Sequence, residues 1–205
     1  MIIARKDRRS ANGFTMIELL VVVGIIAILG GITFGLVSGV SERGRTSRAQ
    51  TELRLIAQAL EQYRSHYGDY PWVNVAEYAQ NDTPELLFNA LAGVLGPQGH
   101  NIVQEETRYG RVFVDFSRLT LLHSDESADH FPDNQNPNSR LENQFIDPWG
   151  NPYRYFYKDE NNPDNWRRSG FLLYSMGPSG SHDAPTNEGT MTDSDENADN
   201  IHHDN

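Results

Sequence analysis

Glu18 is the residue whose chemistry most needs an explanation in this sequence. It is the only ionisable residue between Phe14 and Val40, in a run that begins FTMIELLVVVG. A charged side chain near the centre of a bilayer costs about 2.5–3.5 kcal/mol, and less near the edge. A carboxylate in such an apolar run therefore needs a partner that offsets its burial, and an opposite charge would do so.

A second group of chemically capable residues follows much later in the chain. Asp193, Asp195, Asn197 and Asp199 alternate within one short stretch and offer several oxygen atoms. Calcium takes six to eight oxygen ligands, so the spacing suits a calcium-binding loop. Ala198 stands where an EF-hand loop needs glycine, so we do not expect an EF-hand. The competing interpretation is a disordered acidic tail.

The sequence contains no pattern typical of an enzyme. A Walker loop, a GxSxG elbow and an HExxH motif are all absent. The His-Ser-Asp stretch at 123–125 is not a triad signal, because triad members meet in space rather than along the chain. His182, His202 and His203 could suggest a transition metal, but solvated histidines are the simpler interpretation. We expect no enzymatic activity, with an anchored hydrolase as the alternative.

Composition limits the classes of partner and of site. The chain has 205 residues, enough for one domain and a helical anchor, and a net charge of −11. Arg5, Lys6, Arg8 and Arg9 outweigh Asp7 near the start, so the remainder is still more acidic. This balance argues against nucleic acid as a partner, because phosphate binding needs a basic face. The absence of cysteine excludes disulfides and thiolate metal sites.

The apolar run from Phe14 to Val40 is long enough to cross a membrane as a helix. At about 1.5 Å per residue it would extend over roughly 40 Å, and a bilayer core needs about 30 Å. A cleaved secretory signal fits poorly, because the run exceeds the usual apolar length and no Ala-x-Ala site follows it. An ordinary single-pass anchor explains the length but leaves Glu18 unexplained.

The stretch from Gly13 to Leu20, GFTMIELL, resembles the cleavage site of type IV prepilins and pseudopilins. The resemblance implies that residues 1–13 are a leader, that a membrane peptidase cuts between Gly13 and Phe14, and that Phe14 is then N-methylated. Glu18 becomes the fifth mature residue, where the family keeps its glutamate. Its carboxylate would neutralise the new amine of Phe14, in the family on a neighbouring subunit, and so set the register of assembly.

A ridge of small residues is expected to help the apolar helices pack. Ala27, Gly31, Gly35 and Gly39 recur every fourth residue and so share one helix face. The alternative is that glycine is simply common in membrane helices. The family usually has proline where Gly35 stands, and glycine weakens helices, so we expect a soft segment around residues 30–39.

The same helix should continue as an amphipathic half over residues 41–68. Apolar residues step by three or four along it and predict a stripe that packs on a soluble domain. The stripe consists of Ala49, Leu53, Ile56, Leu60, Tyr63 and Tyr67. Gly68 and Pro71 predict the end of the helix.

The soluble domain, residues 41–205, should contain a short helix and several strands. Thr83 as N-cap and Pro84 in the first turn predict a helix that Gly96-Pro97 stops. Residues 112–116 are a short strand candidate, and the polar stretch 123–144 is predicted to be a loop.

The β region is expected at residues 145–177. Tyr153, Tyr155 and Tyr157 alternate as in a half-buried strand, and residues 171–177 would form its partner. We therefore predict an α+β, pilin-like fold. A long N-terminal helix, with a transmembrane and an amphipathic half, would pack on a small antiparallel sheet with an acidic C-terminal loop at 178–205.

Two segments, DPWGNPY at 147–153 and YSMGPSG at 174–180, closely resemble the major, G-type pseudopilin of type II secretion. Residues 72–144 show no such match. The family holds calcium after its last strand, which here implies the Met176 carbonyl, Ser179 and some of Asp193, Asp195, Asn197 and Asp199. Ser179 stands where the family has aspartate, which puts the site in doubt, and Asp183 could substitute.

The resemblance implies a structural subunit of a type II secretion pseudopilus that pushes protein cargo across the outer membrane. Its partners would be copies of itself, other pseudopilins, the prepilin peptidase and the inner-membrane assembly platform. It would cross the inner membrane once, with the leader cytoplasmic and the domain periplasmic, and then join a periplasmic filament. The alternative is a type IV pilin or minor pilin for adhesion, motility or DNA uptake. Many of those close their C-terminus with a disulfide, which this chain cannot form.

Overall fold

The computed structural model describes residues 14–72, 84–99, 110–123, 143–158 and 163–204, and the side chains of residues 32–40 are also outside the description. The chain divides into two compact units, Met1–Arg43 and Gly44–Asn205. The predicted leader 1–13, the predicted cap Thr83 and residues 124–142 of the predicted loop lie outside the described residues.

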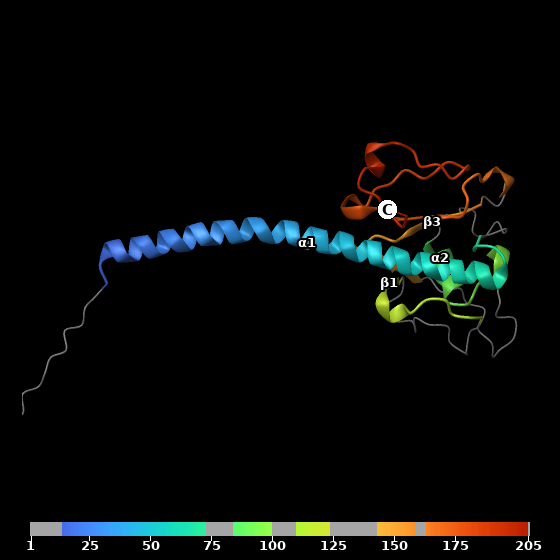
Figure 1. Ribbon diagram of the computed structural model, residues 1–205, viewed down its shortest axis with the longest axis horizontal. Helices are drawn as coiled ribbons and strands as arrows, with labels where there is room; N and C mark the ends of the chain where they lie inside the picture. The colour runs from blue at the N-terminus through green and yellow to red at the C-terminus, as the bar shows by residue number, and fades with distance from the viewer. Residues whose placement is uncertain (1–13, 73–83, 100–109, 124–142, 159–162, 205) are drawn as a thin grey trace, which may run out of the picture. The chain divides into compact units, whose positions relative to one another are not determined.

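One long helix, α1, extends from Met16 to Tyr67 (Figure 1). It continues through residues 30–39, where we expect a soft segment, without a break in its helical backbone. Gly68 ends the helix as predicted, with a left-handed φ of 90° that glycine adopts at no steric cost. Among the residues that the structure describes, no helix meets the length and apolarity needed to span a bilayer. The transmembrane half of the helix therefore stays a prediction.

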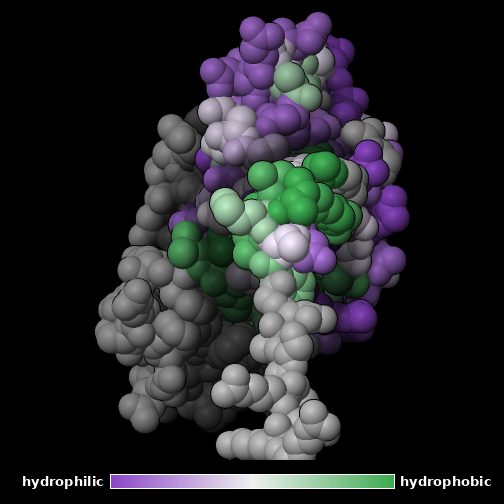
Figure 2. Space-filling model, turned by 90° about the vertical axis from the view of Figure 1, so that its left-hand side faces the viewer, coloured by the Kyte–Doolittle hydropathy of each residue, from purple (hydrophilic) through white to green (hydrophobic). Residues whose placement is uncertain are grey.

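Over residues 14–29 of the first unit, the side chains along α1 are exposed on every face. Figure 2 shows apolar residues gathered on this part of the helix. The large exposed side chains are Phe14, Met16, Ile17, Leu19, Leu20, Val21, Val22, Val23, Ile25, Ile26, Ile28 and Leu29. No described residue of the first unit covers this apolar surface.

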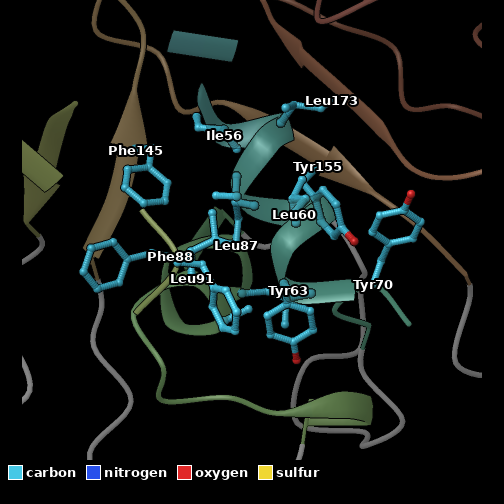
Figure 3. Close-up of a cluster of buried hydrophobic side chains, with 14 of the residues drawn as sticks. Ile56, Leu60, Tyr63, Tyr70, Leu87, Phe88, Leu91, Phe145, Tyr155 and Leu173 are labelled. Atoms are coloured by element: carbon cyan, nitrogen blue, oxygen red, sulfur yellow. The ribbon is translucent and has the colours of Figure 1, made fainter. Parts of the chain in front are cut away.

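In the second unit, α1 buries the predicted stripe. Ala49, Leu53, Ile56, Leu60 and Tyr63 are all 0% exposed, and Tyr67 packs at the margin of the same core. Figure 3 shows this face of α1 against side chains from α2 and from the sheets. The helical period of the apolar residues therefore located the core correctly.

The short helix α2 covers Pro84–Leu91 and ends earlier than predicted. We expected Gly96-Pro97 to stop it, but the chain already turns at Gly93, whose φ is 79°. A Cβ at this position would lie 2.6 Å from the carbonyl oxygen of Gly110, so only glycine fits the crossing of these two segments. Leu95 lies beyond the helix but remains buried in the core.

The predicted strand at 112–116 is wrong. Residues 112–115 are irregular, and a 3₁₀ turn, η3, occupies Phe116–Arg118, with Asp115 accepting a hydrogen bond from the backbone N–H of Ser117 as its N-cap. The strand β1 comes next, at Thr120–His123. An Asp-x-Ser cap of this kind favours a turn over a strand, so the apolar residues nearby were misleading.

The predicted loop at 123–144 is also wrong at both of its ends. His123 closes β1, and Asn143 opens β2, which extends from Asn143 to Ile146. These two strands pair antiparallel and form a sheet of their own. The polar side chains of Asn143 and Gln144 favoured a loop over a strand in the sequence analysis. In the structure, β2 alternates between buried and half-buried residues.

The second sheet has the order β3-β4-β5 and is antiparallel. The expected strands are confirmed as β3, Arg154–Phe156, and β4, Leu172–Ser175. The strand β5, Ile201–His202, was not predicted. All of β4 is buried, because the segment after it returns and covers the face away from α1 with a second small core. The C-terminal segment is therefore folded onto the sheet, and the predicted α+β class is confirmed.

Candidate functional site

The first turn of α1 contains Glu18 and organises its carboxylate. Glu18 Oε2 accepts hydrogen bonds from the backbone N–H and the hydroxyl of Thr15, both at 2.8 Å. In return the backbone N–H of Glu18 donates to Thr15 Oγ1 at 3.3 Å. This is a reciprocal capping box, with Thr15 as N-cap and Glu18 at the third helical position. The carboxylate is thus turned back toward the start of the helix.

The predicted ridge of small residues is unpartnered where it can be described. Ala27 and Gly31 are exposed, and a Cβ added at Gly31 would meet nothing within 4 Å. Gly35 and Gly39 belong to α1, but their surroundings lie outside the description. The role of the ridge in packing therefore stays a prediction, and the same holds for cleavage between Gly13 and Phe14.

A buried carboxylate on α1, Glu52, belongs to a polar link from the helix to β1 and to Tyr153, the residue before β3. Its Oε1 accepts from Arg48 Nε and its Oε2 from the Tyr153 hydroxyl, each at 2.7 Å. Arg48 Nη2 also donates to Thr120 Oγ1 in β1, at 2.7 Å. The pKa of Tyr153 is raised, first by burial and then by its hydrogen bond to Glu52, so its hydroxyl remains a donor at any physiological pH. The four side chains form a polar link through an otherwise apolar interface.

The turn at 147–153, singled out by its sequence, is organised by Asp147. The backbone N–H groups of Trp149 and Asn151 donate to Asp147 Oδ1, both at 2.9 Å. The Ser175 hydroxyl donates to Asp147 Oδ2 at 2.6 Å, and Asn151 Nδ2 donates to the Gly177 carbonyl at 3.0 Å. The turn therefore connects β2 and β3 to the end of β4, and its role in the structure is architectural.

The structure brings some of the predicted calcium ligands together and separates others. The Ser179 hydroxyl and backbone N–H lie against Asp199, and the same hydroxyl is 3.4 Å from the Met176 carbonyl. Asn197 is engaged elsewhere, and the side chains of Asp193 and Asp195 are exposed. Within the described ranges, no three histidine, cysteine or acidic side chains form a group that could hold a metal ion. Calcium binding stays untested.

The tail histidines pack against aromatic rings of the sheet. The Tyr174 hydroxyl lies 2.8 Å from His182 Nδ1, the Tyr174 ring also contacts His202, and His203 stacks on Phe171 at 4.9 Å. Burial lowers the pKa of His182, helped by the charge of Arg154. The pKa of His202 is also lowered, mainly by burial. Of the stretch 123–125, only His123 is described, at the end of β1.

Two functional features were missed from the sequence although each has a signal. The capping box follows the Thr-x-x-Glu pattern before an apolar run, which Thr15 and Glu18 satisfy. Glu52 is three residues after Ala49 and four before Ile56, so helical spacing places it on the buried stripe.

Comparison with known proteins supports the predicted class. Residues 8–34 match the family model described as the prokaryotic N-terminal methylation motif. This range contains the predicted cleavage site, the capping box and most of the exposed apolar surface of α1. The chain therefore carries a prepilin-type methylation motif, as predicted.

The particular relative found is the type II secretion system core protein G of Pseudomonas aeruginosa. It is 25% identical over 182 residues, which cover 89% of this chain and 94% of the relative. No solved structure matches the chain. The two matches support the prediction of a type II secretion pseudopilin and do not favour the type IV pilin alternative.

Proposed function

We propose that this chain is a structural subunit of a type II secretion pseudopilus. The observation that carries the proposal is Glu18, the one carboxylate of an otherwise uncharged helical run, within a matched methylation motif. The similarity to a type II secretion core protein over most of both chains supports the choice of system.

Maturation would cut the chain between Gly13 and Phe14 and methylate the amine of Phe14. The capping geometry supports a pairing of that amine with Glu18, because Thr15 already holds the carboxylate back over the first turn. A cation and a carboxylate each relieve the cost of burying the other in an apolar medium. The pairing would then act between subunits as they are added, and the capping contact within a subunit would serve until then.

The exposed apolar side chains from Phe14 to Leu29 support a position in lipid or among other helices. Such a surface is too large to remain in water. The proposal is a single-pass anchor in the inner membrane with the second unit in the periplasm, followed by a periplasmic filament. Its partners are copies of this chain, other pseudopilins, the prepilin peptidase and the inner-membrane assembly platform.

The proposed work is mechanical and needs no catalytic residue in this chain. The relative's name describes a component of a secretion system and states no enzymatic activity. The power for assembly would come from a cytoplasmic ATPase, and growth of the filament would push cargo outward. Calcium is not needed for this proposal.

The test separates the charge of Glu18 from its capping role. Glutamine at the third helical position can complete a capping box as glutamate does, so Glu18→Gln removes the charge and keeps the cap. Glu18→Ala removes both. We expect both variants to be cleaved and methylated, as mass spectrometry of the mature N-terminus reports, but to lose filaments in electron microscopy and cargo in the medium.

Glu196→Gln is the matched control, because it neutralises an exposed carboxylate of the C-terminal loop. It should assemble and secrete as the parent does. Filaments of parental number and length from Glu18→Gln would refute the charge pairing. An intact Met1 in assembled subunits would refute maturation. Surface pili on the parent, together with normal cargo secretion by the Glu18 variants, would favour the pilin alternative.

A further inference from the structure

The C-terminal loop is fastened to the end of β4 through one residue pair. The backbone N–H of Ser179 donates to Asp199 Oδ2 at 2.8 Å, and its hydroxyl donates to Asp199 Oδ1 at 2.9 Å. Both carboxylate oxygens are thus engaged by a single neutral residue. Hydrogen bonds to an ionised acceptor are stronger than neutral ones, so this pair is a firm contact between segments 20 residues apart.

The backbone at the pair is also in close contact. Gly177 has a left-handed φ of 65°, and a Cβ there would lie 2.4 Å from the carbonyl oxygen of Asp199. The loop can therefore lie this close only because residue 177 has no side chain. Two residues after Asp199 the chain enters β5, where Ile201 pairs with Ser175. The pair at 179 and 199 consequently fixes where β5 begins.

The other predicted cation ligands are occupied or turned outward. Asn197 Oδ1 accepts from the backbone N–H of Asp183 at 3.0 Å and from Asn200 Nδ2 at 2.9 Å. Asp193 and Asp195 are exposed. Calcium needs six to eight oxygens around one point, and among the described residues no group of three acidic or histidine side chains forms such a centre. In the described residues these oxygens are hydrogen-bonded to protein donors or exposed, and they are not gathered around one point.

We propose that the direct contact of Ser179 with Asp199 closes the C-terminal loop, and that this closure needs no bound cation. A single carboxylate that accepts from two neutral donors carries no repulsion that a metal must relieve. Two carboxylates facing each other would need a cation or a shared proton between them. Serine at position 179 therefore replaces a metal bridge with a hydrogen-bonded one.

The first experiment uses the purified full chain in detergent, with tryptophan fluorescence as the readout of unfolding. Trp166 packs against Gly189 in the loop, so its emission also reports loop closure. We expect the same melting temperature in a chelator and in millimolar calcium, and no calcium heat by calorimetry. A melting temperature that rises with calcium, or a saturable calcium heat, would overturn the proposal.

The second experiment compares two aspartates of the same loop. Asp199→Asn places an amide N–H against the donors of Ser179 and should open the loop, whereas Asp193→Asn should change nothing. Cleavage after the exposed residues Glu188 and Glu196 by a glutamate-specific protease measures opening even if the core stays folded. We expect at least tenfold faster cleavage for Asp199→Asn. Equal sensitivity of the two variants, or none for Asp199→Asn, would contradict the proposal.

The third experiment replaces the contact between serine and aspartate with a pair of facing aspartates. Ser179→Asp should make the loop protease-sensitive in chelator, and calcium should restore parental resistance in this variant alone. Ser179→Ala keeps the backbone donor and removes the hydroxyl, so its cleavage rate should lie between those of the parent and Asp199→Asn. If Ser179→Asp is as resistant as the parent in chelator, the direct contact does not hold the loop.

Discussion

Both parts of α1 have a helical backbone, but they differ in how their apolar side chains are covered. Ile25 and Leu29 are 52% and 59% exposed in the first unit, whereas Leu53 and Ile56 are 0% exposed in the second. The first part is apolar on all its faces, and the second is apolar along one stripe. A stripe can be covered by a small sheet of the same chain. A uniformly apolar helix needs other molecules, either lipids or further helices.

The largest difference between the two parts should appear when leucine is shortened to alanine. Leu60→Ala removes buried contacts and should lower the free energy of unfolding by about 2–5 kcal/mol. Leu20→Ala, on the exposed part, should leave it unchanged. Tryptophan fluorescence during urea unfolding measures this directly, because Trp72, Trp149 and Trp166 all belong to the second unit. Equal losses of unfolding free energy for the two variants would show that the two parts of α1 do not differ in this way.

A smaller effect is expected where α1 is held to the sheets by polar groups. Glu52→Ala leaves the Tyr153 hydroxyl without an acceptor and removes the partner of Arg48, which should cost about 1–3 kcal/mol. Tyr153→Phe should cost less, because Glu52 keeps Arg48. A double-mutant cycle in urea should give a coupling of at least about 0.5 kcal/mol, and additive losses would show that the hydrogen bond contributes little.

The stability of the second unit should fall as the pH is lowered from 6.5. The folded-state pKa values of His182 and His202 are lowered, mainly by burial, so the unfolded chain binds more protons in this range. Each histidine contributes at most about 1.4 kcal/mol per pH unit, starting near the unfolded pKa of about 6.5. Arg154 and Arg168 oppose protonation, whereas Asp183 and Asp204 favour it.

Urea unfolding between pH 4.5 and 7 would test this pH dependence. Replacing both histidines by asparagine should flatten the profile, and the same change at the exposed His66 should not. A profile with unchanged slope in the double variant would assign the dependence to other groups.

The smallest effect is expected from glycine in the exposed part of α1. Gly31→Ala meets no neighbour within 4 Å and should raise local helix stability by at most about 1 kcal/mol. In the proposed filament, a bulkier Gly31→Leu should reduce assembly, because close helix approach needs small residues. Circular dichroism in detergent and filament counts measure the two effects. Full assembly by Gly31→Leu would show that the ridge of small residues is not needed for helix packing.

The sequence predicted the features that depend on short-range periodicity. The stripe from Ala49 to Tyr63 and the stop at Gly68 follow from helix geometry alone, and both are confirmed. The resemblance at the N-terminus is supported by the family match. In the β region, the alternation from Tyr153 to Tyr157 located β3, because every second side chain faces the same core.

The features that depend on contacts distant in sequence were not predictable in this way. Nothing local in Ile201 and His202 marks a strand, and they form β5 only because the loop returns to β4. Phe156 has the alternation of an outward residue, yet the returning segment buries it to 8% exposure. Strand β2 was hidden for a similar reason, since Asn143 gains its partner from His123 across residues 124–142.

The position of β5 along the chain has a consequence for how the second sheet is made. Strand β4 is complete at residue 175, but its outer neighbour is supplied only at residues 201 and 202. Until a ribosome has passed that point, β4 presents an unpaired edge at Tyr174 and Ser175, and unpaired edges template aggregation. Premature release, or proteolytic trimming a few residues upstream, would therefore yield an aggregation-prone protein rather than one of slightly lower stability.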